Sequence, residues 1–145
     1  MTKILASKYL IIISQLILAI VFIVAGIEKI SDQTIFATKI SNYKVFPIWS
    51  INFIAISLPW IELINGVLLI YGIRKKEIAG IFGFLLFFFI VLIFISILRG
   101  LDIDCGCFGT IDSIKVGYAK IYENVFLFIL CLHLYFFSDK KANGI

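Results

Sequence analysis

Two cysteines separated by a single glycine, Cys105-Gly106-Cys107, are the residues of this 145-residue chain best suited to chemistry. A disulfide requires Cα atoms within about 7 Å of each other, and a glycine between the cysteines can adopt the turn that closes so short a ring. Because the ring is small and strained, its disulfide is easier to reduce than a structural one. So short a loop also removes little chain entropy, and the spacing therefore favours thiol–disulfide exchange over stabilisation of the fold.

Two other interpretations of the pair stay open, since reduced cysteines could simply shape a turn or could bind a metal ion. Zinc would need two further soft ligands, and the single histidine, His133, belongs to the far end of the last apolar segment. We therefore expect no metal. Asp102 and Asp104 place negative charge beside the pair, which disfavours a thiolate. We expect the pair to rest as the disulfide and to be attacked by the thiolate of a partner.

Glu62 is the second candidate site residue, because it lies near the middle of a long apolar segment, residues 48–70. A carboxylate at that depth is expensive and usually faces the interior of a helix bundle. It could hold a proton or hydrogen-bond a quinone, which is the candidate cofactor. Alternatively it only fixes helix packing by pairing with Asn65, Asn124 or a backbone group. Lys29 is a further candidate partner, but we expect its ammonium to extend to the lipid headgroups.

The elements that must position these residues are apolar helices. The chain is 62% hydrophobic and 15% charged, whereas soluble domains are about half apolar and about a quarter charged. Four segments are long and apolar enough to span a bilayer, namely residues 9–27, 48–70, 78–98 and 121–137. We predict an all-α fold in which residues 1–145 form a single domain, a four-helix transmembrane bundle. The first segment is too long for the core of a signal peptide, so we expect it to be retained.

The segment between the first two spans is predicted to be a short amphipathic helix in the headgroup region. Ile35, Phe36 and Ile40 can share one of its faces, with Lys39 and Lys44 at the margins of that face. Cys131, in the last span, is expected to be a small buried hydrophobic residue.

The basic residues near the ends of the spans predict the orientation of the bundle. A compact basic triplet, Arg74-Lys75-Lys76, favours placing its loop and both termini in the cytoplasm (N-in, C-in). The two sides otherwise carry similar numbers: Lys3, Lys8, Arg74, Lys75, Lys76, Lys140 and Lys141 on one, and Lys29, Lys39, Lys44, Arg99, Lys115 and Lys120 on the other.

In that orientation the cysteine pair faces the periplasm or exterior of a bacterial inner membrane, where disulfides persist. The lysines that produce the net charge of +4 flank apolar runs. We therefore expect the lipid bilayer as a partner and no nucleic acid.

The string DCGCFG, residues 104–109, resembles a motif of the MauE/DoxX-like membrane proteins, the group that includes the methylamine-utilisation protein MauE. Residues 25–30, residues 58–63 with Gly66, and Gly117-Tyr118 with Asn124 resemble the first, second and fourth helices of that family. Glu123 departs from the pattern, because we expect a basic residue before the asparagine.

The resemblance implies a four-helix membrane bundle that helps to mature exported proteins by managing their disulfides. It further implies a partner that is an exported thioredoxin-like protein or a thiol-containing substrate protein. Cys105 and Cys107 would be the redox pair of such a thiol–disulfide oxidoreductase component. The alternatives are a non-enzymatic scaffold or chaperone for a partner protein, and metal-ion handling at the outer face.

Overall fold

The structure, a computed structural model, describes residue 4, residues 7–100 and residues 118–138 of the chain. Its helices are α2 (Lys8–Ser31), α3 (Gln33–Asn42), α4 (Ile48–Ile70), α5 (Lys75–Leu98) and α6 (Tyr118–Phe137). Within the described residues α2, α4 and α5 are long and apolar enough to cross a membrane, and Ile121–Phe137 forms a shorter apolar helix. The predicted all-α fold built from four apolar helices is confirmed.

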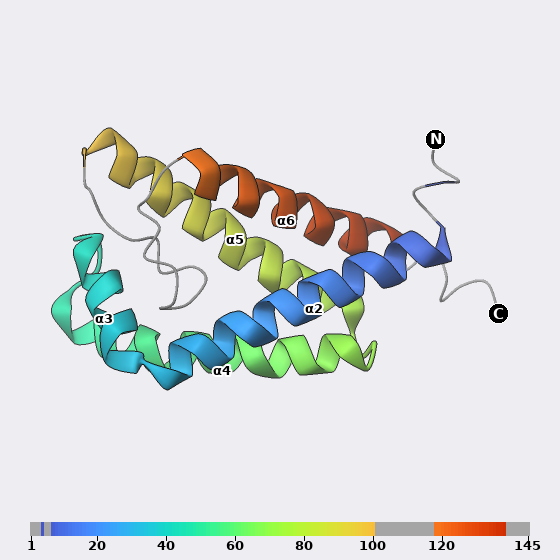
Figure 1. Ribbon diagram of the computed structural model, residues 1–145, viewed down its shortest axis with the longest axis horizontal. Coiled ribbons are helices and arrows are strands. Elements are labelled where there is room, and N and C mark those ends of the chain that lie inside the picture. The colour runs from blue at the N-terminus through green and yellow to red at the C-terminus, as the bar shows by residue number, and fades with distance from the viewer. Residues whose placement is uncertain (1–3, 5–6, 101–117, 139–145) are drawn as a thin grey trace.

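The long helices form two closely packed pairs, α2 with α4 and α5 with α6, and α2 also packs against α6. By contrast, α4 and α5 meet at the turn formed by residues 71–74, make few contacts, and diverge toward the end of the bundle where α3 lies (Figure 1). The short helix α3 packs against α4 near this open end. The bundle is therefore forked between α4 and α5.

Two helices extend beyond their predicted limits into charged sequence. The helix α2 continues to Ser31, four residues past the predicted end at residue 27, and α5 begins at Lys75, three residues before residue 78. The extension of α2 places Lys29 inside the helix and on its buried face. A lysine that the sequence predicted at the membrane interface is thus part of the bundle interior.

Close contact between α2 and α4 depends on two glycines. A Cβ atom added to Gly26 would lie 2.9 Å from the Pro59 carbonyl oxygen and 3.1 Å from the Leu63 nitrogen. A Cβ atom on Gly66 would lie 2.7 Å from Cγ1 of Ile23. Small residues allow the backbones of membrane helices to approach this closely, and the packing of the two helices replaces contact with lipid.

We expect Gly26→Ala to lower the free energy of unfolding by about 1–2 kcal/mol, because the added methyl group meets the backbone of α4 and must push the helices apart. The matched control is Gly80→Ala, whose Cβ would lie 3.7 Å from the Tyr135 ring. That change should be neutral or slightly stabilising, since alanine favours the helix. Detergent-induced unfolding of the purified protein measures both, and equal stability of the two variants would contradict the packing described here.

The amphipathic segment is a helix, α3, but its buried face differs from the predicted one. Phe36 and Ile40 are buried as expected, whereas Ile35 is 45% exposed. Lys39 was predicted at the margin and is instead buried. Residues three and four apart share a helix face, which groups Phe36 with Lys39 and Ile40 and turns Ile35 away. The position of α3 in the headgroup region stays a prediction.

Candidate functional site

The predicted redox pair, Cys105 and Cys107, lies outside the described residues, together with Asp102 and Asp104. The helix α5 ends at Leu98 and α6 begins at Tyr118, so the segment that carries the pair connects these two helix ends. Both ends lie at the forked end of the bundle, on the same side as α3 (Figure 1). The role of the pair stays a prediction.

A buried ion pair joins α2 to α4 at this end. The Nζ atom of Lys29 donates to both carboxylate oxygens of Glu62, at 2.9 Å to Oε1 and 2.8 Å to Oε2. The side chains are 0% and 2% exposed. The expectation that Lys29 extends to the headgroups is therefore wrong, because Glu62 supplies a counter-charge inside the bundle. The expectation that Glu62 faces the interior is confirmed.

Aromatic rings from two other helices enclose the lysine. Its Nζ atom lies 5.5 Å from the centre of the Phe36 ring of α3 and 5.8 Å from the centre of the Phe89 ring of α5. A cation at this distance from an aromatic ring is attracted by its quadrupole. Lys29 consequently contacts groups from α3, α4 and α5 and helps to define how these helices meet.

One of the two amides proposed as partners of Glu62 is bonded elsewhere. Asn65 donates to the backbone oxygen of Ile61 at 2.7 Å, within α4, so it is not the partner of the carboxylate in this structure. Asn124 of α6 is fully buried. The structure thus brings Glu62 together with Lys29, while a proton-carrying or quinone-binding role for Glu62 stays a prediction.

A second group of polar contacts lies toward the opposite end of the bundle, and it was not predicted. The Gln15 side chain donates from Nε2 to the backbone oxygen of Leu69 at 2.6 Å, which satisfies a carbonyl near the end of α4. The Ser14 hydroxyl lies 3.2 Å from Nδ1 of His133 on α6. A glutamine and a serine within an apolar run were the available signals, since polar groups at that depth need partners.

The third cysteine, Cys131, is 1% exposed and packs in an apolar cluster that includes Phe82 and Leu134. Its predicted role as a small buried residue is confirmed. Burial among apolar groups raises the cost of a thiolate and excludes a soluble partner.

Among the described residues, no three His, Cys, Asp or Glu side chains are grouped as a metal site requires.

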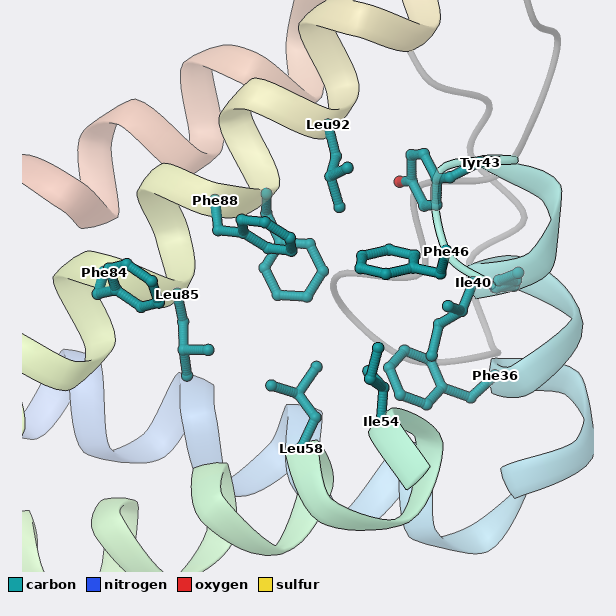
Figure 2. A pocket seen from close by; sticks show the side chains of 12 residues that line it. Phe36, Ile40, Tyr43, Phe46, Ile54, Leu58, Phe84, Leu85, Phe88 and Leu92 are labelled. Atoms are coloured by element: carbon teal, nitrogen blue, oxygen red, sulfur yellow. The ribbon is translucent and has the colours of Figure 1, made fainter. Parts of the chain in front are cut away.

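The fork between α4 and α5 holds a cavity of about 240 Å³, which α3 closes on one side. Figure 2 shows its side chains converging from the three helices, with Ile54 and Leu58 from α4 and Phe88 and Leu92 from α5. Phe36 and Phe89, the two rings beside the Lys29 ammonium, also line it. Among the described lining residues the polar side chains are Lys39 and Tyr43; Glu62 is not one of them.

Comparison with known proteins identifies the family. The family model of the methylamine utilisation protein MauE matches residues 7–137. This chain belongs to the MauE family. The resemblance expected from the DCGCFG motif is thereby confirmed, and the matched MauE range includes the ion pair, the cavity and both candidate cysteines. No solved structure matches the chain significantly.

Several curated MauE proteins are similar to this chain. The MauE of Paracoccus denitrificans is 29% identical over 119 residues, which are 81% of this chain and 64% of that protein. The MauE of Methylorubrum extorquens is 29% identical over 101 residues (69% and 54%). The MauE of Methylophilus methylotrophus is 32% identical over 95 residues (65% and 50%). The chain thus spans between half and two thirds of the length of these relatives.

Proposed function

We propose that this MauE-family membrane protein takes part in thiol–disulfide exchange that assists the maturation of exported proteins, with Cys105 and Cys107 as the exchanging pair. The observation that carries the proposal is the burial of Cys131. The chain has three cysteines, and Cys131 is 1% exposed inside the bundle. Exchange with a protein outside the membrane therefore rests on the two cysteines between α5 and α6.

The proposed reaction is a direct exchange with one partner. A thiolate of the partner attacks one sulfur of the Cys105–Cys107 disulfide and forms a mixed disulfide, which frees the other cysteine. The second thiol of the partner then attacks the partner's sulfur in the mixed disulfide and releases the remaining cysteine. The partner leaves with a disulfide. The pair gains two electrons and two protons from the partner and is left as two thiols. An exported thioredoxin-like protein or a thiol-containing substrate protein fits this role. The names of the relatives concern methylamine utilisation, and we propose that the exported protein served here belongs to that process.

The proposed orientation places both termini in the cytoplasm and the cysteine pair outside the inner membrane. The sequence alone divides the basic residues seven to six between the two sides. Two of the six, Lys29 and Lys39, are buried in the bundle, so four basic residues remain in the count for that side. The larger difference supports a cytoplasmic location for the basic turn at residues 74–76.

We expect a membrane-impermeant maleimide, added to intact cells, to label this protein only after mild reduction. The reagent reaches thiols outside the membrane, and a disulfide protects Cys105 and Cys107 until it is reduced. Cys131 should stay unlabelled in both conditions because it is buried. Mass spectrometry of the purified protein counts the added groups, and two are expected.

Two results would contradict this proposal. Labelling before reduction would show that the pair rests as free thiols outside the membrane, which favours an electron-donating, metal-binding or structural role. Absence of labelling in intact cells, with labelling in opened membranes, would place the pair in the cytoplasm and reverse the proposed orientation.

A further inference from the structure

We propose that the end of the bundle opposite α3 binds the phosphate headgroup of an anionic phospholipid. A second cavity, of about 270 Å³, lies there between the first turn of α2, the turn that joins α4 to α5, and the residue that follows α6 (Figure 1). Its described lining residues include three consecutive basic residues, Arg74, Lys75 and Lys76, together with Ser138. Binding at this basic cavity is independent of thiol exchange at the cysteine pair.

The charges that line the basic cavity leave an excess of positive charge. Glu77 is the single carboxylate among its described lining residues, against three basic side chains. Arg74 and Lys75 form no ion pair with Glu77 or with another described residue. Cations without a counter-charge attract an anion, and arginine can donate two parallel hydrogen bonds to a phosphate.

Uncharged hydrogen-bond donors lie at the same place. Within the described part of the chain, the Ser138 hydroxyl oxygen is buried and has no hydrogen-bond partner, and a buried hydroxyl normally has one. The helix α5 begins at Lys75, and the side chain of Arg74 does not cap it. The amide groups of the first turn of α5 therefore lack a partner within the helix. Such amides favour the negatively charged oxygens of a phosphate.

The surroundings of the basic cavity favour a lipid over free phosphate. Tyr71 and Ile73, in the same turn, are 76% and 49% exposed, so apolar surface adjoins the basic side chains. Lys76 places its Nζ atom 5.4 Å from the centre of the Tyr135 ring on α6. Tyr135 also lines a mostly apolar groove of about 480 Å³ between α5 and α6. An acyl chain can lie in this groove while its headgroup occupies the cavity.

The test is equilibrium binding of lipids to the purified full chain in detergent micelles, measured by native mass spectrometry. Phosphatidylglycerol should bind at least about tenfold more tightly than phosphatidylcholine, whose headgroup carries no net charge. Arg74→Asn should weaken binding of phosphatidylglycerol about fivefold, and Arg74→Asn/Lys75→Gln at least about tenfold. The control is Lys8→Gln, an exposed basic residue at the start of α2 that does not line the cavity. Its affinity should stay within about twofold.

The Arg74→Asn variant also separates loss of binding from loss of the fold. The backbone of Arg74 has a φ of 46°, in the left-handed region, where asparagine is more readily accommodated than arginine. In lipid-free detergent this variant should therefore be at least as stable as the parent protein.

Three results would overturn the proposal. The first is equal affinity for phosphatidylglycerol and phosphatidylcholine. The second is equal affinity of the Arg74→Asn and Lys8→Gln proteins for phosphatidylglycerol. The third is complete displacement of phosphatidylglycerol by an equal concentration of inorganic phosphate, which would assign the basic cavity to a soluble phosphate compound.

Discussion

Replacing Glu62 with leucine is expected to lower the free energy of unfolding by about 3–5 kcal/mol, since removal of one partner leaves the other charge buried and uncompensated. The Lys29 ammonium is 0% exposed and donates to both oxygens of the lost carboxylate. Water cannot replace those contacts in the bundle interior. Detergent-induced unfolding of the purified protein, followed by circular dichroism, gives the change in free energy.

The double variant Lys29→Met/Glu62→Leu should recover at least about half of that loss, because an apolar pair of similar volume needs no counter-charge. Glu77→Leu is the control, since Glu77 is exposed in the first turn of α5. Its effect should stay below about 1 kcal/mol. Losses that simply add in the double variant would show that the two residues do not act as a pair.

The second large effect concerns function. Proteoliposomes that contain the protein should oxidise the thiols of a reduced thioredoxin-like protein added outside, and Cys105→Ser/Cys107→Ser should reduce this rate to the uncatalysed level. The serine hydroxyl cannot form the mixed disulfide on which the exchange depends. Loss of reagent-accessible thiol over time measures the rate when an oxidant such as menadione is supplied.

The control for the cysteine variants is Cys131→Ala. This residue of α6 is buried in an apolar cluster of the bundle interior, so its replacement should leave the exchange rate within about twofold, at a cost in stability of about 1 kcal/mol. Full activity of the double serine protein would favour the scaffold interpretation. Loss of activity in Cys131→Ala, with the fold intact, would require a path for electrons through the bundle.

The helices were predictable from the sequence because the length of an apolar run is itself the physical requirement for spanning a bilayer. Their ends were less predictable. Treating a charged residue as the boundary of a span stopped the first helix at residue 27, yet α2 continues to Ser31. The Lys29 side chain can lie inside the bundle only because Glu62 neutralises its charge. These two residues are 33 positions apart in the sequence.

The interior position of Glu62 followed from the cost of a carboxylate in the membrane, but its partner did not. Which lysine meets it depends on how closely α2 and α4 cross, and that crossing depends on Gly26 and Gly66. Sequence distance carries no such information. The same reasoning applies to Lys39, whose burial depends on the packing of α3 against α4.

The cavity could not be predicted from the apolar pattern at all. Its lining residues, such as Leu58 and Phe88, are indistinguishable in sequence from residues that face lipid or the core. The space exists because α4 and α5 diverge from their shared turn while α3 closes the gap (Figure 1). The angle between two helices is a property of their packing and not of either sequence segment alone.

The central claim, that Cys105 and Cys107 exchange disulfides with an exported partner, is tested most directly by trapping the mixed disulfide. Cells that produce Cys105→Ser or Cys107→Ser are quenched with acid and a maleimide, and the protein is analysed by non-reducing electrophoresis. The account predicts that one of the two variants carries an exported protein as an adduct that reductant releases, and that the double serine variant carries none. Absence of an adduct from both single variants, with the proteins present in the membrane, would contradict it.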